Sequence, residues 1–253
     1  MNMRAIVVRH YKTLLNASGR IMGWGDAPRA KDWGDDIAYI YNRLRELDIS
    51  FDRVYSSNLE RARRTAMHYA RSYGILCLHD AAELNEVNYG ALYNKSKQWV
   101  TKHIPQHKKD PDFVYPEGES FRQMQKRSVD FLLSQNAFYP ESTVLVVVHA
   151  GVIRGFVSHF LGLDYARHLK QKVSHRYIGD FTLAPDNTCM RYDELGKHSG
   201  FVRSGAVRVP WTNSTIDGKP AVDPVTASSA TKRPGCTSDT PLSLHSDIIR
   251  KPV

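Results

Sequence analysis

The sequence contains little cysteine and no long apolar run. Its three cysteines, Cys77, Cys189 and Cys236, lie far apart and form no C-x-x-C pair. This spacing argues against a disulfide framework, a zinc site and a thioredoxin-type redox centre, and it favours a reducing compartment. The longest apolar run, 144–148, has five residues, whereas a membrane span needs about 20. The apolar stretch near the N-terminus is too short for a signal peptide, so we expect a cytoplasmic protein without a membrane partner.

Aromatic residues are missing from the segment 212–253. Its 42 residues include twelve Ser or Thr and five Pro, but no Phe, Tyr or Trp. Such a segment buries too little apolar surface to offset the entropy lost on ordering. The chain as a whole is 42% hydrophobic and 24% charged, which is typical of a globular protein. We therefore predict one folded domain over 1–211 and a flexible tail over 212–253.

Acidic residues are fewer than basic ones. The chain has 35 Lys and Arg against 26 Asp and Glu, so its formal net charge is +9. A basic balance is compatible with nucleic acid, an anionic membrane or phosphorylated small molecules as partners. Composition alone does not choose among these three classes.

Short apolar segments alternate with helical patterns. We predict strands at 3–8, 51–55, 75–78 and 143–148, and a late hairpin from 181–183 and 189–192. Apolar spacing predicts helices at 33–47, 119–134 and 152–161, and another from the capping residues 56–58 to residue 73. The run 143–148 is continuously apolar, as central strands are. The alternation predicts an α/β fold, a three-layer α/β/α sandwich with a mostly parallel central sheet.

Two histidines directly follow predicted strands. His10 comes after the first strand and is preceded by Arg9, and His149 comes after the central strand. In open α/β sheets, functional groups gather where strands end and loops begin. A lone histidine is more often a packed or surface residue, which we expect of the other nine. The positions of His10 and His149 make them candidate site residues.

A basic segment follows the second predicted strand. Arg61 falls in the first turn of the helix that begins after 56–58. Free backbone N–H groups and the helix dipole favour an anion there, and the guanidinium fork matches phosphate oxygens. The alternative is an ordinary solvated helix, which fits Arg63 and Arg64.

Five motifs stand in order between residues 3 and 195. They are Arg9-His10 with Asn16 and 19–24, then 57–66, 84–90, 116–120 and 147–151. In this order they resemble the motifs of the histidine phosphatase superfamily, the phosphoglycerate mutase-like group. Each motif alone is a weak signal, so the order carries the resemblance. It implies that 1–211 is a catalytic domain of this kind.

The resemblance also implies roles for four of these residues. His10 would be the nucleophile that becomes a phosphohistidine, which splits one difficult displacement into two. Arg9, Arg61 and His149 would surround the phosphoryl oxygens and stabilise their charge in the transition state. The resemblance implies no metal and no cofactor.

The acid and the substrate contacts are likewise implied by the resemblance. Glu86 would protonate the leaving oxygen and then activate water, with Glu83 as the local competitor. The implied substrate-binding residues are Tyr11, Asn16, Gly23, Tyr89 and Ala150. Tyr11 departs from the family, which usually has glycine there, and we expect its ring to line the pocket.

Three functions fit the sequence. A phosphomonoester phosphatase is favoured by 116–120 and by His149-Ala150-Gly151. A phosphoglycerate mutase is favoured by 84–92 and by the cations Lys108-Lys109, but lysine does not reproduce a bidentate arginine. A non-catalytic binding protein is favoured by Tyr11, the basic balance and the tail.

We expect the phosphatase, acting without metal on a small phosphorylated metabolite. We expect no nucleic acid partner, because arginines of a phosphate site already explain part of the positive charge. The oligomeric state is open, a homodimer included.

Overall fold

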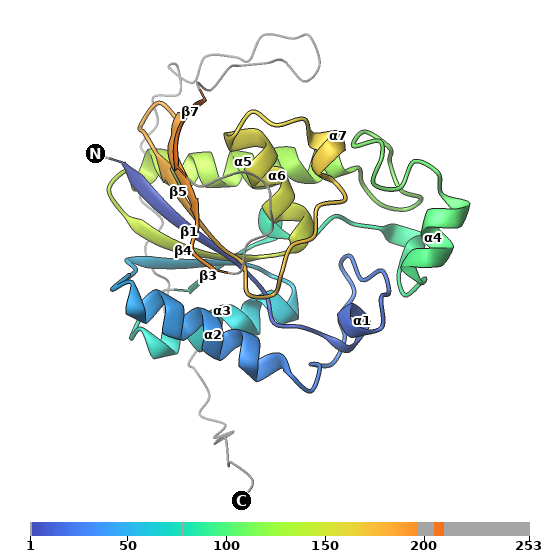
Figure 1. Cartoon of the computed structure of the whole chain (residues 1–253), viewed down its shortest axis with the longest axis horizontal. Coiled ribbons are helices and arrows are strands. Elements are labelled where there is room, and N and C mark those ends of the chain that lie inside the picture. The colour runs from blue at the N-terminus through green and yellow to red at the C-terminus, as the bar shows by residue number, and fades with distance from the viewer. Residues whose placement is uncertain (1, 77, 197–204, 210–253) are drawn as a thin grey trace, which may run out of the picture. The chain divides into compact units, whose positions relative to one another are not determined.

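The computed structural model describes residues 2–76, 78–196 and 205–209 (Figure 1). The predicted tail at 212–253 lies outside the described residues. No helix within the described ranges is long and apolar enough to cross a membrane.

One mixed sheet of seven strands forms the centre of the described structure, in the order β3-β2-β4-β1-β5-β6-β7. The strands β1 to β4 are parallel to one another. Beyond β1 the sheet continues with β5, β6 and β7, each antiparallel to the strand before it in the sheet. Their bounds are Met3–Arg9 (β1), Arg53–Ser57 (β2), Leu78–Ala81 (β3), Thr143–Val148 (β4), Ile178–Leu183 (β5), Cys189–Glu194 (β6) and Gly205–Val209 (β7). The predicted hairpin is confirmed as β5 and β6.

Helices cover both faces of the sheet, so the predicted α/β/α sandwich is confirmed. Helices α2 (Trp33–Glu46) and α3 (Glu60–Ser72) lie on one face, and α5 (Phe121–Phe138) and α6 (Ala150–Phe160) lie on the other (Figure 1). The short helices α1 (Leu14–Ala17), α4 (Lys97–His103) and α7 (Tyr165–His168) lie beyond the end of β1. Two short 3-10 turns, η1 (Ala82–Leu84) and η2 (Gly90–Leu92), complete the fold.

The two cores follow from the alternation of side chains along β1 and β4. Ala5 and Val7 of β1 belong to the cluster that packs under α5 and α6. Ile6 and Val8 belong to the cluster under α2 and α3. Because successive strand residues point to opposite faces, a strand buried on both sides must be apolar throughout. That is why the apolar runs of β1 and β4 lie at the centre of the sheet.

The third strand is not where the sequence predicts it. The prediction places it at 75–78, but β3 begins at Leu78, and Leu76 is 91% exposed. The amide of Ile75 still bonds to the carbonyl of Ala70, because the chain is leaving helix α3 there. As an edge strand, β3 tolerates the polar residues His79 and Asp80, so its sequence lacks a strand pattern.

Helix α3 also begins later than predicted. Ser56 and Ser57 belong to β2, and the N-cap is Leu59, which makes no side-chain cap. The hydroxyl of Ser57 instead accepts from the amide of Leu59 at 3.1 Å. The serines therefore support the turn between strand and helix, and Arg61 stays in the first turn of α3.

Candidate active site

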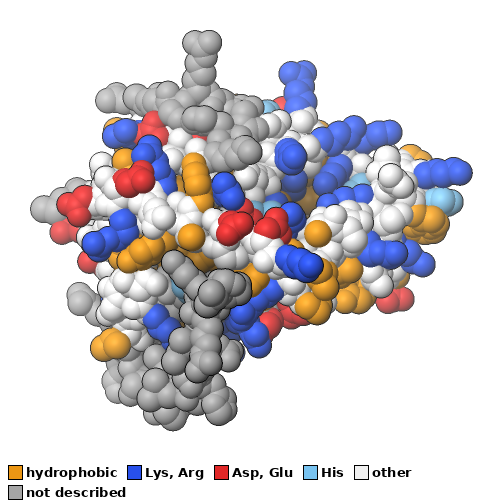
Figure 2. Space-filling model, turned by 60° about the horizontal axis from the view of Figure 1, so that its bottom comes forward, with side chains coloured by type: hydrophobic (Ala, Val, Ile, Leu, Met, Phe, Trp, Pro, Cys, Tyr) orange, Lys and Arg blue, Asp and Glu red, His pale blue; other side chains and the backbone are white. Residues whose placement is uncertain are grey.

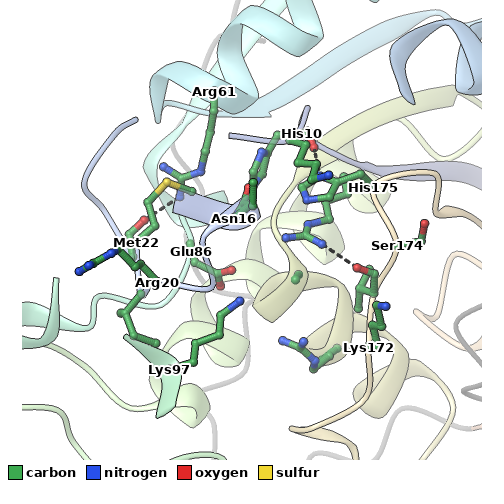
Figure 3. A pocket seen from close by; sticks show the side chains of 18 of the residues that line it. His10, Asn16, Arg20, Met22, Arg61, Glu86, Lys97, Lys172, Ser174 and His175 are labelled. Carbon is green, nitrogen blue, oxygen red and sulfur yellow. Dashed lines mark hydrogen bonds between the residues drawn. The ribbon is translucent and has the colours of Figure 1, made fainter. Parts of the chain in front are cut away.

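A cavity of about 630 Å³ opens where β1, β2 and β4 end (Figure 3). Most of the predicted site residues line it, although they come from five separate segments. Those on its wall are Arg9, His10, Asn16, Gly23, Arg61, Glu86, Tyr89 and Ala150. His149 and Tyr11 are not on the wall.

His10 directly follows β1 and is 2% exposed. Its ring Nδ1 lies 2.6 Å from the carbonyl oxygen of Tyr11, and a carbonyl can only accept, so Nδ1 carries the proton. Burial, together with the charge of Arg61, holds the pKa of His10 well below its usual range. The ring is therefore neutral, with the lone pair on Nε2, which is the form of a nucleophile.

Two arginines place buried positive charge beside His10. Arg61 is 1% exposed, and its guanidinium donates to the carbonyls of Gly23 (2.6 Å) and Gly25 (2.8 Å). Arg9 donates to the carbonyl of Val173 at 2.6 Å. Burial, with Arg154 nearby, lowers the pKa of Arg9 to about 9, and burial also lowers the pKa of Arg61.

The two guanidinium groups are suited to an anion. The Nε of each is buried without a hydrogen-bond partner. A buried charge is costly unless an opposite charge faces it. The half-exposed carboxylate of Asp26 already faces Arg61 at 3.3 Å. A phosphoryl group in the cavity would add negative charge beside both guanidinium groups and would accept charge-assisted hydrogen bonds.

His149 is the N-cap of α6 and lies behind His10, with the ring centroids 5.0 Å apart. It is fully buried, and neither ring nitrogen has a hydrogen-bond partner. Burial holds its pKa well below the usual range. An unsatisfied buried polar group costs about 1–3 kcal/mol, so the ring of His149 has unused hydrogen-bonding capacity next to His10, although it is not on the cavity wall.

Glu86 faces the cavity from the loop before η2. Its carboxylate accepts from the amides of Val87 (3.0 Å) and Gly151 (3.1 Å), the second lying in the first turn of α6. A Cβ on residue 151 would lie 2.0 Å from Oε1 of Glu86, so only glycine allows this approach. The competitor Glu83 is not on the cavity wall.

The side-chain NH₂ group of Asn16 is available to donate a hydrogen bond in the cavity. Its Oδ1 accepts from the amide of Thr13 at 3.2 Å in a capping box at α1, which directs its NH₂ group away from that contact.

Gly23 links two loops of the cavity wall. Its carbonyl accepts a hydrogen bond from Arg61, and its φ is +54°. A Cβ there would lie 3.1 Å from the amide nitrogen of Tyr89, so glycine lets the two loops meet.

The expectation for the Tyr11 side chain is wrong. The ring is 4% exposed and packs edge-on against Trp33, at 5.8 Å between centroids, in the core under α2 and α3. A tyrosine ring buries a large apolar area, and this core provides the place for it. Only the main chain of Tyr11 serves the site, since its carbonyl orients His10 and its amide donates to Thr65.

Several cavity residues were missed by sequence reasoning. Arg154 on α6 is 7% exposed, and its Nε donates to the carbonyl of Gln171 at 2.7 Å. His175 donates from Nδ1 to the carbonyl of His10 at 2.8 Å, and burial lowers its pKa to about 2. Of these two residues, only Arg154 could have been found from the sequence. It lies one helical turn after Gly151 of the fifth motif, and residues at that spacing share one face of a helix.

The mutase-type cation Lys108 does line the cavity, whereas Lys109 does not. Burial, with Arg154 and Lys97 nearby, lowers the pKa of Lys108 to about 7. In Figure 3, Lys97 and Lys172 approach the cavity from the side opposite Arg61 and His10.

The cavity wall is strongly basic. It carries ten Lys or Arg side chains against three carboxylates, and two of those carboxylates already pair with Lys12 and Arg176. Figure 2 shows Lys and Arg gathered on the side of the molecule that carries α1, α4 and α7. Such a field concentrates anionic ligands. No group of three His, Cys, Asp or Glu residues that could hold a metal ion occurs in the described part of the chain.

Comparisons with known proteins agree with this geometry. Residues 5–187 match the model of the histidine phosphatase superfamily (branch 1). A 2,3-bisphosphoglycerate-dependent phosphoglycerate mutase from Bartonella tribocorum is 26% identical over 197 residues, which cover 74% of this chain and 96% of the mutase.

Two solved structures share the fold. An alpha-ribazole phosphatase from Shigella flexneri superposes with a TM-score of 0.64 at 21% identity, covering 82% of this chain and 96% of that one. A mycobacterial glucosyl-3-phosphoglycerate phosphatase in complex with VO3 has a TM-score of 0.65 at 20% identity, covering 76% and 96%.

Proposed function

Because this chain belongs to the histidine phosphatase superfamily, we propose that it is a metal-independent phosphatase that hydrolyses a small phosphomonoester through a phosphohistidine at His10. The observation that supports this most is the state of the His10 ring. It is neutral, its Nδ1–H is bound to the Tyr11 carbonyl, and it stands beside the buried guanidinium of Arg61 and the half-buried Arg9. The fold is also that of the two phosphatases named above.

The first step forms a bond from Nε2 of His10 to phosphorus and breaks the bond from phosphorus to the leaving oxygen. Arg9, Arg61 and His149 stabilise the charge on the remaining phosphoryl oxygens. Glu86 gives its proton to the leaving oxygen. Figure 3 shows His10 and Glu86 directed into the same cavity from different segments, as this transfer requires.

The second step returns the enzyme to its starting state. Water attacks the phosphohistidine, Glu86 takes the proton of that water, and the bond from Nε2 to phosphorus breaks to release inorganic phosphate. The NH₂ group of Asn16 donates to a phosphoryl oxygen. Gly23, Tyr89 and Ala150 form the wall against which the substrate packs.

A screen of phosphomonoesters in the presence of a metal chelator tests this proposal. We expect release of inorganic phosphate that the chelator does not reduce. Acid-labile phosphate should be trapped on wild-type protein quenched during turnover. A wild-type protein that hydrolyses no phosphomonoester, or one that chelation inactivates, contradicts the proposal.

A phosphoglycerate mutase is the second candidate, favoured by the mutase relative and by Lys97, Lys108 and Arg154 in the cavity. These cations exceed what one phosphoryl group needs, so they favour a leaving group with an acidic group of its own. Incubation with 2,3-bisphosphoglycerate and 3-phosphoglycerate separates the two functions. A mutase forms 2-phosphoglycerate, whereas a phosphatase releases inorganic phosphate.

The third function, a non-catalytic binding protein, was favoured partly by Tyr11. That argument no longer holds, because the Tyr11 ring does not obstruct the cavity. The expectations of a cytoplasmic location and of no nucleic acid or membrane partner stay predictions. Whether the protein forms a homodimer also stays open.

A further inference from the structure

Arg127 of helix α5 joins that helix to the loop that carries Glu86. It does not line the cavity. Its guanidinium donates to four main-chain carbonyl oxygens in succession, those of Ala82 (3.4 Å), Glu83 (2.6 Å), Asn85 (2.8 Å) and Glu86 (3.0 Å). One side chain thus satisfies most of the carbonyls in the segment that leads into the candidate acid.

Glu119 completes this clamp from the segment before α5. It receives two hydrogen bonds from Arg127, at 2.6 Å and 3.1 Å, and one from the amide of Asn88 at 2.9 Å. Its own amide donates to the carbonyl of Asn88 at 3.0 Å. Arg127 and Glu119 are 21% and 17% exposed, so the pair is mostly shielded from water. Together they hold the chain on both sides of Glu86.

Trp24 also donates to the Glu86 carbonyl, at 2.7 Å, and Ser57 donates to the Asn85 side chain at 2.7 Å, so Arg127 and Glu119 share the loop with these two contacts. Residues 85–89 belong to no helix or strand, so no ladder of backbone hydrogen bonds holds them. The carboxylate of Glu86 must nevertheless meet the amide of Gly151 on a different element. A shift of about 1 Å in a catalytic group can reduce a rate by about 10²-fold.

We propose that Arg127, held by Glu119, is a positioning residue that sets the Glu86 carboxylate for proton transfer. The proposal rests on the proposed function, in which Glu86 protonates the leaving oxygen. Arg127 acts through the main chain and touches neither the substrate nor the cavity. The competing explanation is an ion pair that only stabilises the fold.

Kinetics with two leaving groups test the proposal. Arg127→Met and Glu119→Gln should reduce kcat on an alkyl phosphate by about 10–10²-fold, because that leaving oxygen needs a proton. The same variants should change little on a nitrophenyl phosphate, whose leaving group needs little protonation. The inhibition constant of inorganic phosphate should not change. Lys126→Met, which removes only an exposed pair with Asp130, is the matched control.

A double variant separates positioning from general damage. In a Glu86→Gln background, Arg127→Met should lower the alkyl phosphate rate little further, since residues that act through one group are not additive. A full additional loss, or an equal loss on both substrates, overturns the proposal. Arg127→Lys should recover only part of the rate, because an ammonium has three donors and no planar fork.

Hydrogen exchange keeps the inference testable even if the proposed function fails. In wild type and Lys126→Met, the amides of 82–88 should be equally protected. In Arg127→Met they should exchange faster, while protection across β1 and β4 stays the same. If the wild type hydrolyses neither phosphate, the proposed function is wrong. Unchanged protection of 82–88 in Arg127→Met would show that the clamp itself is wrong.

Discussion

The cavity has two ends that differ in how their residues are held. At the phosphoryl end, His10 and His149 follow central strands, and Arg61 stands in the first turn of a helix. Each is buried. At the outer end, Lys97, Lys108 and Lys172 lie on short elements or loops, and Lys97 and Lys172 are exposed. In the proposed function, the sheet therefore fixes the groups that carry out the reaction, while the loops carry the groups that would meet the rest of the substrate.

This comparison predicts that variants at the phosphoryl end affect every substrate, whereas variants at the outer end affect only some. The strongest test is His10→Ala, which should lower kcat by about 10³-fold or more on all phosphomonoesters because it removes the nucleophile. Acid-labile phosphate should no longer be trapped. His103→Ala, an exposed histidine of α4, is the control. Full activity of His10→Ala would sink the proposed mechanism.

Glu86→Gln should have the next largest effect. We expect kcat on an alkyl phosphate to fall by about 10²–10⁴-fold, with a much smaller fall on a nitrophenyl phosphate. Glu83→Gln is the matched control, since its side chain is not on the cavity wall. If Glu83→Gln shows the dependence on leaving group instead, the acid has been assigned to the wrong residue.

Gly151→Ala probes the same carboxylate from helix α6. The new Cβ would lie 2.0 Å from Oε1 of Glu86, so the carboxylate must move. We expect about a 10²-fold loss on an alkyl phosphate. Gly155→Ala in the same helix meets only ordinary contacts of 3.4 Å or more and should keep its rate. Equal rates for the two variants would show that this position of Glu86 does not matter.

At the outer end, Lys108→Met should raise KM about tenfold for a substrate whose leaving group is acidic. It should not change KM for a simple alkyl phosphate. The pKa of Lys108 is about 7, so its side chain is positive below that pH and neutral above it. Binding of the acidic group should therefore weaken as the pH rises through 7. Lys108→Arg should abolish that pH dependence, and an unchanged profile would remove Lys108 from the substrate site.

The smallest kinetic effect is expected at Tyr11, which belongs to neither end. Tyr11→Leu should leave kcat and KM unchanged on both kinds of substrate. It should destabilise the fold by about 1–3 kcal/mol, because the ring packs in the core under α2 and α3. Thermal unfolding measures the loss. A changed choice of substrate would place the ring in the cavity after all.

The same contrast explains what could be predicted from the sequence. β1 and β4 are buried on both faces, so they need unbroken apolar runs, and these runs located His10 and His149. β3 lies at the edge and contains His79 and Asp80, so no such run marks it. The order of the motifs along the chain indicated the cavity, but it could not indicate every side chain that points into it.

The misplaced and missed residues depend on contacts between distant segments. The direction of the Tyr11 ring is set by Trp33 and Arg29, which lie about 20 residues further along the chain. His175 meets the carbonyl of His10 across 165 residues of sequence. No periodic pattern within a segment reports such contacts, so only the folded chain could reveal them.

The contacts of segment 173–176 have a consequence for how the protein is made. The carbonyl of Val173 holds Arg9, His175 binds the carbonyl of His10, and Arg176 pairs with Asp36. The nucleophile therefore leaves the ribosome early, but the residues that secure its surroundings are synthesised more than 160 positions later. Because long-range contacts form late in folding, a nascent chain that ends before residue 173 carries His10 without a finished site. We therefore expect the proposed activity to begin only when the chain has been translated past residue 176.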